Sequence, residues 1–121
     1  RISIWLARVY ILFNLAIIFH MESLVQSSRI QKAQHCYSMI LVILSSNEFP
    51  MTKSSLYTIV LNNLCEIYHR RGEFEKLRQC VRNLRLSLGC RESRELLGKQ
   101  EYREITVNTR TLQEPTAAAS A

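Results

Sequence analysis

The sequence predicts an all-α protein made of antiparallel helical hairpins. Of its 121 residues only 3 are Gly and 2 are Pro, so residues that favour turns are scarce. All ten acidic residues are Glu and twelve of the sixteen basic residues are Arg, and both side chains favour helices. Apolar residues also recur at the i, i+3, i+4, i+7 spacing of amphipathic helices. With 47% apolar residues, a chain of this length fits one globular domain or a piece of one.

The first helix is predicted over residues 2–21. Residues 2–19 are apolar nearly all round, which is typical either of a helix buried on most sides or of a membrane span. Such a segment reaches roughly 27 Å as a helix, just under the thickness of a bilayer's hydrocarbon core. Arg8 in its middle would cost about 2.5–3.5 kcal/mol on insertion. Composition therefore leaves both interpretations open.

The second helix is predicted over residues 29–45, antiparallel to the first. The polar, Ser-rich stretch 22–28 forms the connecting loop. The helical pattern ends before Pro50, because the residue that precedes a proline avoids the helical region. The apolar face of this helix is expected to contain Ile30, Ala33, Tyr37, Ile40, Leu41 and Leu44.

A second hairpin follows, with helices predicted over residues 55–71 and 73–88. Thr52 or Ser54 offers an N-cap for the first of them, and basic residues followed by Gly72 are a typical helix end. The other helix is expected to end at Gly89. Its predicted core stripe is Phe74, Leu77, Val81, Leu84 and Leu88.

The C-terminal part is mostly polar. Residues 90–112 are expected to form a capping segment with a weak helix, anchored by scattered apolar residues such as Ile105. The Ala-rich tail, residues 113–121, is predicted to be disordered, because it cannot bury enough surface to offset its ordering entropy. The tail, together with a start at Arg1, leads us to expect a C-terminal fragment of a longer protein.

The two hairpins form an internal repeat. Residues 12–20 align with residues 61–69 at an offset of 49, with Leu, Asn, Leu, Ile and His identical. The second helices align at an offset of 44, which leaves a longer loop in the first hairpin. The aligned pairs there include Lys32 with Lys76, Cys36 with Cys80, and Ile40 with Leu84.

This repeat resembles the tetratricopeptide repeat family over residues 2–89. The family's first-helix pattern of a large residue, Leu, a small residue and an aromatic is met by Leu61, Leu64, Cys65 and Tyr68, followed by Gly72 in the turn. Residues 62–76 are similar to the Asn-Asn-Leu repeats of kinesin-light-chain-type arrays. The resemblance implies hairpins stacked as a right-handed α-superhelix.

The sequence departs from the family where Leu77 replaces a small Ala and Gly89 stands in place of Pro. Because about three repeats are usually needed for stability, two repeats predict further N-terminal repeats or a partner that covers the exposed face. Helix 2–21 would then lie between other helices. The repeat also favours the array over a membrane span, since a span has no reason to repeat an amphipathic pattern.

The resemblance also implies a function, namely a non-enzymatic scaffold that binds a peptide or partner helix in the groove formed by the first helices of the repeats. An Asn in this groove can bind a ligand backbone or, alternatively, fix the packing of neighbouring helices. The histidines can cap their helix ends or face the groove. The implied groove residues are Asn14, Ile17, His20, Ile59, Asn62, Asn63, Glu66, His69 and Arg70.

A basic face is the alternative binding surface. The net charge of +6 would suit nucleic acid or an acidic partner. The face lacks interleaved exposed aromatics for base stacking, and Glu73 and Glu75 partly compensate it, so a solvated outer face is favoured and nucleic-acid binding is the minor alternative. Its residues are Lys76, Arg78, Arg82 and Arg85.

The cysteines and histidines show no metal-binding spacing, and no Ser/His/Asp set can form because the chain has no Asp. We therefore expect no cofactor, no metal and no catalytic centre. Three of the four cysteines, Cys36, Cys65 and Cys80, lie within apolar helical patterns, where a thiol behaves as a small hydrophobic group. Reduced, buried thiols favour a cytoplasmic location.

Overall fold

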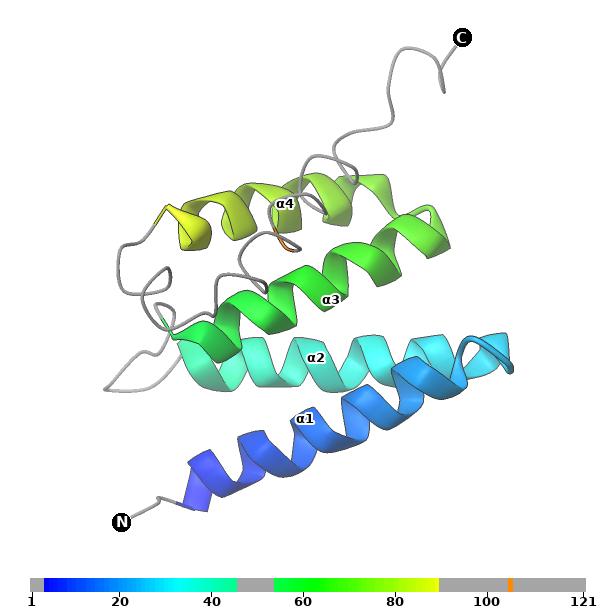
Figure 1. Cartoon of the computed structure of the whole chain (residues 1–121), viewed down its shortest axis with the longest axis horizontal. Helices are drawn as coiled ribbons and strands as arrows, with labels where there is room; N and C mark the ends of the chain where they lie inside the picture. Colours follow the sequence, from blue (N-terminus) through cyan, green and yellow to red (C-terminus); the bar gives the residue numbers. More distant parts are fainter. Residues whose placement is uncertain (1–3, 46–53, 90–104, 106–121) are drawn as a thin grey trace, which may run out of the picture. The chain divides into compact units, whose positions relative to one another are not determined.

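The computed structural model describes residues 4–45, 54–89 and 105, and every regular element among them is helical. This confirms the predicted all-α class. The chain divides into two compact units, Arg1–Pro50 and Met51–Ala121. Each unit contains one pair of antiparallel helices, drawn in Figure 1 from blue to cyan for the first and in green to yellow for the second.

The first hairpin pairs α1 (Ile4–Glu22) with α2 (Ile30–Ser45), which lie side by side. The connection contains a 3-10 turn at Ser27–Arg29, within the stretch that the sequence predicts as a loop and the start of the second helix. Ser23, the first residue of the connection, donates its backbone N–H to the Phe19 carbonyl at 2.9 Å and so extends the end of α1.

The core of the first hairpin comes mainly from α2. Four α2 side chains are fully buried, and they belong to the predicted apolar face: Ala33, Tyr37, Ile40 and Leu44. In α1 only Val9 and Ala16 are buried. Within the described chain α1 is therefore buried on one side only, where α2 covers it, and the predicted burial between further helices stays a prediction.

The second hairpin pairs α3 (Ser55–Arg71) with α4 (Phe74–Leu88). Ser54 caps α3, its hydroxyl accepting the Tyr57 backbone N–H at 3.2 Å, as predicted for one of the two candidate caps. Gly72 ends α3 in the left-handed conformation, with φ of 69°. The Gly72 and Glu73 N–H groups donate to the carbonyls of His69 and Tyr68, which is a Schellman motif.

The interface between α3 and α4 contains a polar pair that the sequence pattern does not predict. The hydroxyls of Thr58 and Ser87 hydrogen-bond each other, and both residues are buried. Nearby, the Cys80 thiol donates to the Leu61 carbonyl at 3.2 Å. The contacts between these two helices therefore combine apolar packing with satisfied polar groups.

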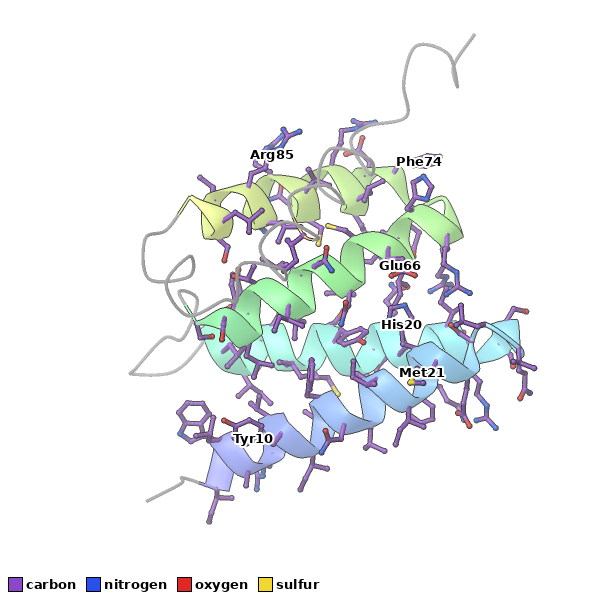
Figure 2. All side chains as sticks on the ribbon, in the orientation of Figure 1. Tyr10, His20, Met21, Glu66, Phe74 and Arg85 are labelled. Atoms are coloured by element: carbon purple, nitrogen blue, oxygen red, sulfur yellow. The ribbon has the colours of Figure 1, made fainter. Side chains whose placement is uncertain are left out.

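One residue of α4 differs from the sequence-based expectation, whereas the end of the helix at Gly89 is confirmed. The sequence predicts Phe74 in the core stripe, but its side chain is 40% exposed, because Phe74 is the first residue of α4 and lies directly after the turn (Figure 2). Gly89 ends α4 with φ of −72°, an ordinary right-handed conformation that needs no glycine. Of the predicted capping segment only Ile105 is described, and it is helical and buried, whereas the tail 113–121 lies outside the described residues.

The two hairpins bury equivalent positions on the faces where their helices meet. At the offset of 49, Val9 corresponds to Thr58 and Ala16 to Cys65, and all four are buried. At the offset of 44, five further pairs of α2 and α4 are buried: Ala33 with Leu77, Cys36 with Cys80, Tyr37 with Val81, Ile40 with Leu84, and Leu44 with Leu88.

The two hairpins differ in a second face of their first helices, α1 and α3. Val60, Leu64 and Ile67 of α3 are fully buried. Their equivalents in α1 are exposed, with 60% of Ile11, 40% of Leu15 and 52% of Ile18 accessible. The repeated pattern is therefore covered in one hairpin and uncovered in the other.

Candidate partner-binding surface

The α1 part of the predicted groove contains one exposed and two half-buried side chains. Asn14 is exposed, whereas Ile17 and His20 are half-buried. Asn14 and Ile17 are one helical turn apart, as are Ile17 and His20, so the three follow one another along one side of α1.

His20 is positioned by α2. Its Nδ1 lies 3.1 Å from the Tyr37 hydroxyl, and the two rings meet edge to face with centroids 5.7 Å apart. The Phe13 ring packs edge to face against the same tyrosine, with ring centroids 6.5 Å apart. At this end of α1 the His20 carbonyl accepts the Ser23 hydroxyl at 2.5 Å. The sequence suggested capping or groove contact for His20, but it did not indicate this contact with Tyr37.

The α3 part of the groove is more covered. Four residues are half-buried, namely Ile59, Asn62, Asn63 and Glu66, whereas His69 and Arg70 are exposed in the last turn. Ile59, Asn62 and Glu66 follow one side of the helix at i, i+3, i+7. Figure 2 shows Glu66 on the half of α3 that leads toward the turn. The structure thus groups the α1 residues in one unit and the α3 residues in the other.

The basic face lies on α4 and is partly neutralised by its own helix. Lys76 Nζ lies 3.2 Å from a Glu73 carboxylate oxygen, and Arg78 Nη1 donates to Glu75 at 2.9 Å. Arg82 Nη1 donates to the Gln79 amide oxygen at 3.5 Å. Arg85 is exposed on the same helix (Figure 2). Two of the four predicted cations are therefore paired with carboxylates one turn earlier.

The described cysteines are unpaired and buried, as the sequence pattern predicts. A hydrogen bond with the Cys65 thiol, together with burial, raises the pKa of the Cys80 thiol far above its usual value. Burial also raises the pKa of Cys36. Because the thiolate is the reactive form, these thiols are poor nucleophiles near neutral pH.

The most exposed apolar surface of α1 is one that the sequence did not mark as a site. Its side chains are Ile4, Tyr10, Ile11, Leu15, Ile18 and Met21. Figure 2 shows Tyr10 and Met21 toward opposite ends of the helix. The signal that could have identified this surface is the seven-residue spacing of Ile4, Ile11 and Ile18, which the apolar surroundings conceal.

By length and composition, α1 could also cross a bilayer. Among the described residues, no group of three His, Cys or acidic side chains could hold a metal ion. The chain matches no known protein family, no curated protein and no solved structure in the comparisons made. A functional proposal for this chain therefore depends on its own residues.

Proposed function

We propose that the chain is a tetratricopeptide-like helical-repeat module that binds a protein partner without catalysis and without a cofactor. The observation that carries this proposal is the equivalence of the two hairpins. Val9 and Thr58 are buried at matching positions of α1 and α3, and Cys36 and Cys80 at matching positions of α2 and α4. Repeated hairpins of this kind act by presenting surfaces to partners. A right-handed superhelical stacking of the hairpins and a cytoplasmic location belong to the same proposal.

The binding site that we propose is the groove formed by α1 and α3. In α3 the residues that would contact a partner are Asn62, Asn63 and Glu66, followed by His69 and Arg70 in the last turn. Amide groups can donate to and accept from the backbone of an extended peptide. The exposed His69 and Arg70 would add donors at one end of the site.

The test is a pull-down with two matched sets of variants at moderate salt. The groove variant carries Asn63→Ala and His69→Ala, and the basic-face variant carries Arg78→Ala, Arg82→Ala and Arg85→Ala. The proposal expects a protein partner that is lost with the groove variant and retained with the basic-face variant. Circular dichroism of both variants checks that the helices are intact.

The opposite result identifies the basic face as the working surface. In that case nucleic acid or an acidic protein would be lost only with the Arg variant, and binding would weaken steeply with salt. The pairing of Lys76 with Glu73 and of Arg78 with Glu75 disfavours this alternative, because those charges are already partly compensated.

Membrane anchorage through α1 is a second candidate, favoured by its length and its exposed apolar side chains. The equivalent face of α3 argues against it, because Val60, Leu64 and Ile67 are buried in protein. Carbonate extraction separates the two candidates, since an anchored protein stays with the membrane pellet and a module bound only through protein contacts is released.

A further inference from the structure

The exposed side of α1 carries a heptad pattern. If Ile4 is assigned to position a, then Ile11 and Ile18 also fall at a, and Ala7, Asn14 and Met21 fall at d. All six side chains are exposed. A repeat of this kind, with β-branched residues at a, is the pattern by which helices pair along a seam. We call these six residues the α1 seam.

The α1 seam lies opposite the side of α1 that packs within the hairpin. Val9 and Ala16, the two buried residues of α1, both fall at position f of the same heptad. Position f points away from the a and d positions on a helical wheel. One side of α1 is therefore packed against α2, and the opposite side is exposed in the part of the chain that the structure describes.

The second hairpin supports the interpretation of this side as a packing face rather than a lipid face. Ile11 and Ile18 of the seam correspond to Val60 and Ile67 of α3 at the offset of 49, and both α3 residues are fully buried. The repeat thus uses these positions for packing within a protein. A bilayer, in contrast, would have to accommodate Arg8 and Asn14, which are both exposed on α1.

Charge complementarity identifies the occupant. Positions e of the heptad hold Arg8 near one end and Glu22 at the other. In an antiparallel pair of identical helices, e positions face e positions, so Arg8 of each copy meets Glu22 of the other, and the two-fold symmetry makes this contact twice. Among the described residues, the Glu22 carboxylate forms a loose ion pair with Arg29, at 3.9 Å.

We propose that the chain forms a symmetric antiparallel dimer through the α1 seam, with α1 of one copy packed against α1 of a second copy. The seam is short, so the dimer is expected to be weak and to form in the micromolar range or above. Asn14 at position d would face an a-position isoleucine of the other copy in an antiparallel pair, which weakens the dimer further. This inference concerns the first hairpin alone and does not depend on groove binding by α3.

The test is sedimentation equilibrium of the full chain over increasing concentration, up to about 1 mM. The wild type is expected to approach twice the monomer mass. The double variant Ile11→Glu, Ile18→Glu is expected to stay monomeric with unchanged helix content, because both side chains are exposed within the hairpin. The matched control is Val42→Glu with Leu86→Glu, which are exposed to a similar degree outside the seam and should leave the dimer intact.

A charge exchange tests the orientation. Arg8→Glu alone and Glu22→Arg alone should each raise the dissociation constant about two- to fivefold. The double exchange should restore it, because the contacts between copies are then rebuilt with reversed sign. If the losses of binding free energy of the two single variants simply add in the double variant, the antiparallel arrangement is overturned.

Three results would overturn the dimer itself. The first is a wild type that remains monomeric at all concentrations, and the second is a dimer that persists in the Ile11→Glu, Ile18→Glu variant. The third is a monomer that sediments with phosphatidylcholine vesicles, which would assign the α1 seam to a bilayer. Loss of partner capture with the Asn63→Ala, His69→Ala variant leaves these results unchanged, so the two proposals fail separately.

Discussion

Helices α1 and α3 carry the same apolar pattern, yet they differ in how much of it is covered. Val60, Leu64 and Ile67 are inaccessible in α3, whereas Ile11, Leu15 and Ile18 are 40% or more exposed in α1. The difference teaches that a repeated sequence pattern specifies a face suited to packing, while the neighbour that covers the face must be supplied separately. In a repeat architecture the neighbour is the next unit or a partner.

The largest expected difference between the two helices is the cost of removing one equivalent leucine. Leu64→Ala should lower the free energy of unfolding by about 2–5 kcal/mol, because it leaves a cavity in a buried site. Leu15→Ala should cost roughly 1 kcal/mol or less in dilute solution, since part of that side chain stays in water. Urea denaturation of the two variants measures both values.

Raising the protein concentration sharpens this comparison. Leu15 falls at position e of the heptad, directly beside the α1 seam. If a dimer buries the seam together with Leu15, the cost of Leu15→Ala should increase with concentration while the cost of Leu64→Ala stays constant. Equal costs for the two substitutions in dilute solution would contradict the exposure of the α1 face.

A second difference lies on the faces that pair within each hairpin. The buried hydroxyls of Thr58 and Ser87 bond each other, whereas the equivalent positions in the first hairpin hold Val9 and Ile43. Ser87→Ala should cost about 1–3 kcal/mol, because it leaves the Thr58 hydroxyl without this partner. The double variant Thr58→Val, Ser87→Ala should cost less than the sum of the single variants. Strictly additive costs in a double-mutant cycle would contradict the hydrogen bond.

Alkaline pH should destabilise the second hairpin. The pKa of Cys80 is raised in the folded state by the hydrogen bond with Cys65 and by burial, so above pH 9 the unfolded chain releases a proton that the folded chain keeps. The free energy of unfolding should therefore be unaffected below about pH 8 and fall above pH 9 by up to about 1.4 kcal/mol per pH unit.

Urea titrations from pH 7 to 10 measure this fall. Cys80→Ala is the control, which should be less stable at pH 7 but should show a smaller loss at high pH. A slope identical to that of the wild type would assign the alkaline sensitivity to other groups, such as Tyr57, whose pKa is also raised by burial.

The smallest expected effect comes from the two glycines that follow α3 and α4. Gly72→Ala should cost about 1 kcal/mol, because φ of 69° is strained for a residue with a Cβ even though the added methyl meets no atom within 4 Å. Gly89→Ala should be neutral or slightly stabilising, since its φ of −72° suits any residue. Thermal unfolding measures the stability of both variants. Equal losses of stability for Gly72→Ala and Gly89→Ala would contradict the left-handed conformation of Gly72.

Local signals account for what could be predicted. The bounds of α3 agree with the predicted range 55–71, because the Ser54 cap and the Gly72 turn act within a few residues of the helix ends. The core face of α2 follows from helical spacing alone. The Phe74 position shows the limit of such spacing, because a residue can fit the apolar stripe and still lie beyond the partner helix.

Contacts between distant residues could not be predicted. The His20 ring meets Tyr37 of the other helix, and Thr58 meets Ser87, at separations of 17 and 29 residues. No periodicity encodes such pairs, since they depend on how two helices dock. The α1 seam was missed for another reason: residues 2–19 are so uniformly apolar that the heptad within them does not stand out. The groove, the function and the stacking of the repeats stay predictions.

The Schellman turn leaves only Gly72 and Glu73 between α3 and α4, whereas seven residues, Ser23–Arg29, connect α1 and α2. A shorter connection costs less loop-closure entropy, and contacts close in sequence form fastest. We therefore expect the contacts between α3 and α4 to form first beside this turn and then along the two helices, within microseconds to milliseconds and before the first hairpin forms. The order of folding would then run from the C-terminal unit to the N-terminal one, opposite to the order in which the chain is synthesised.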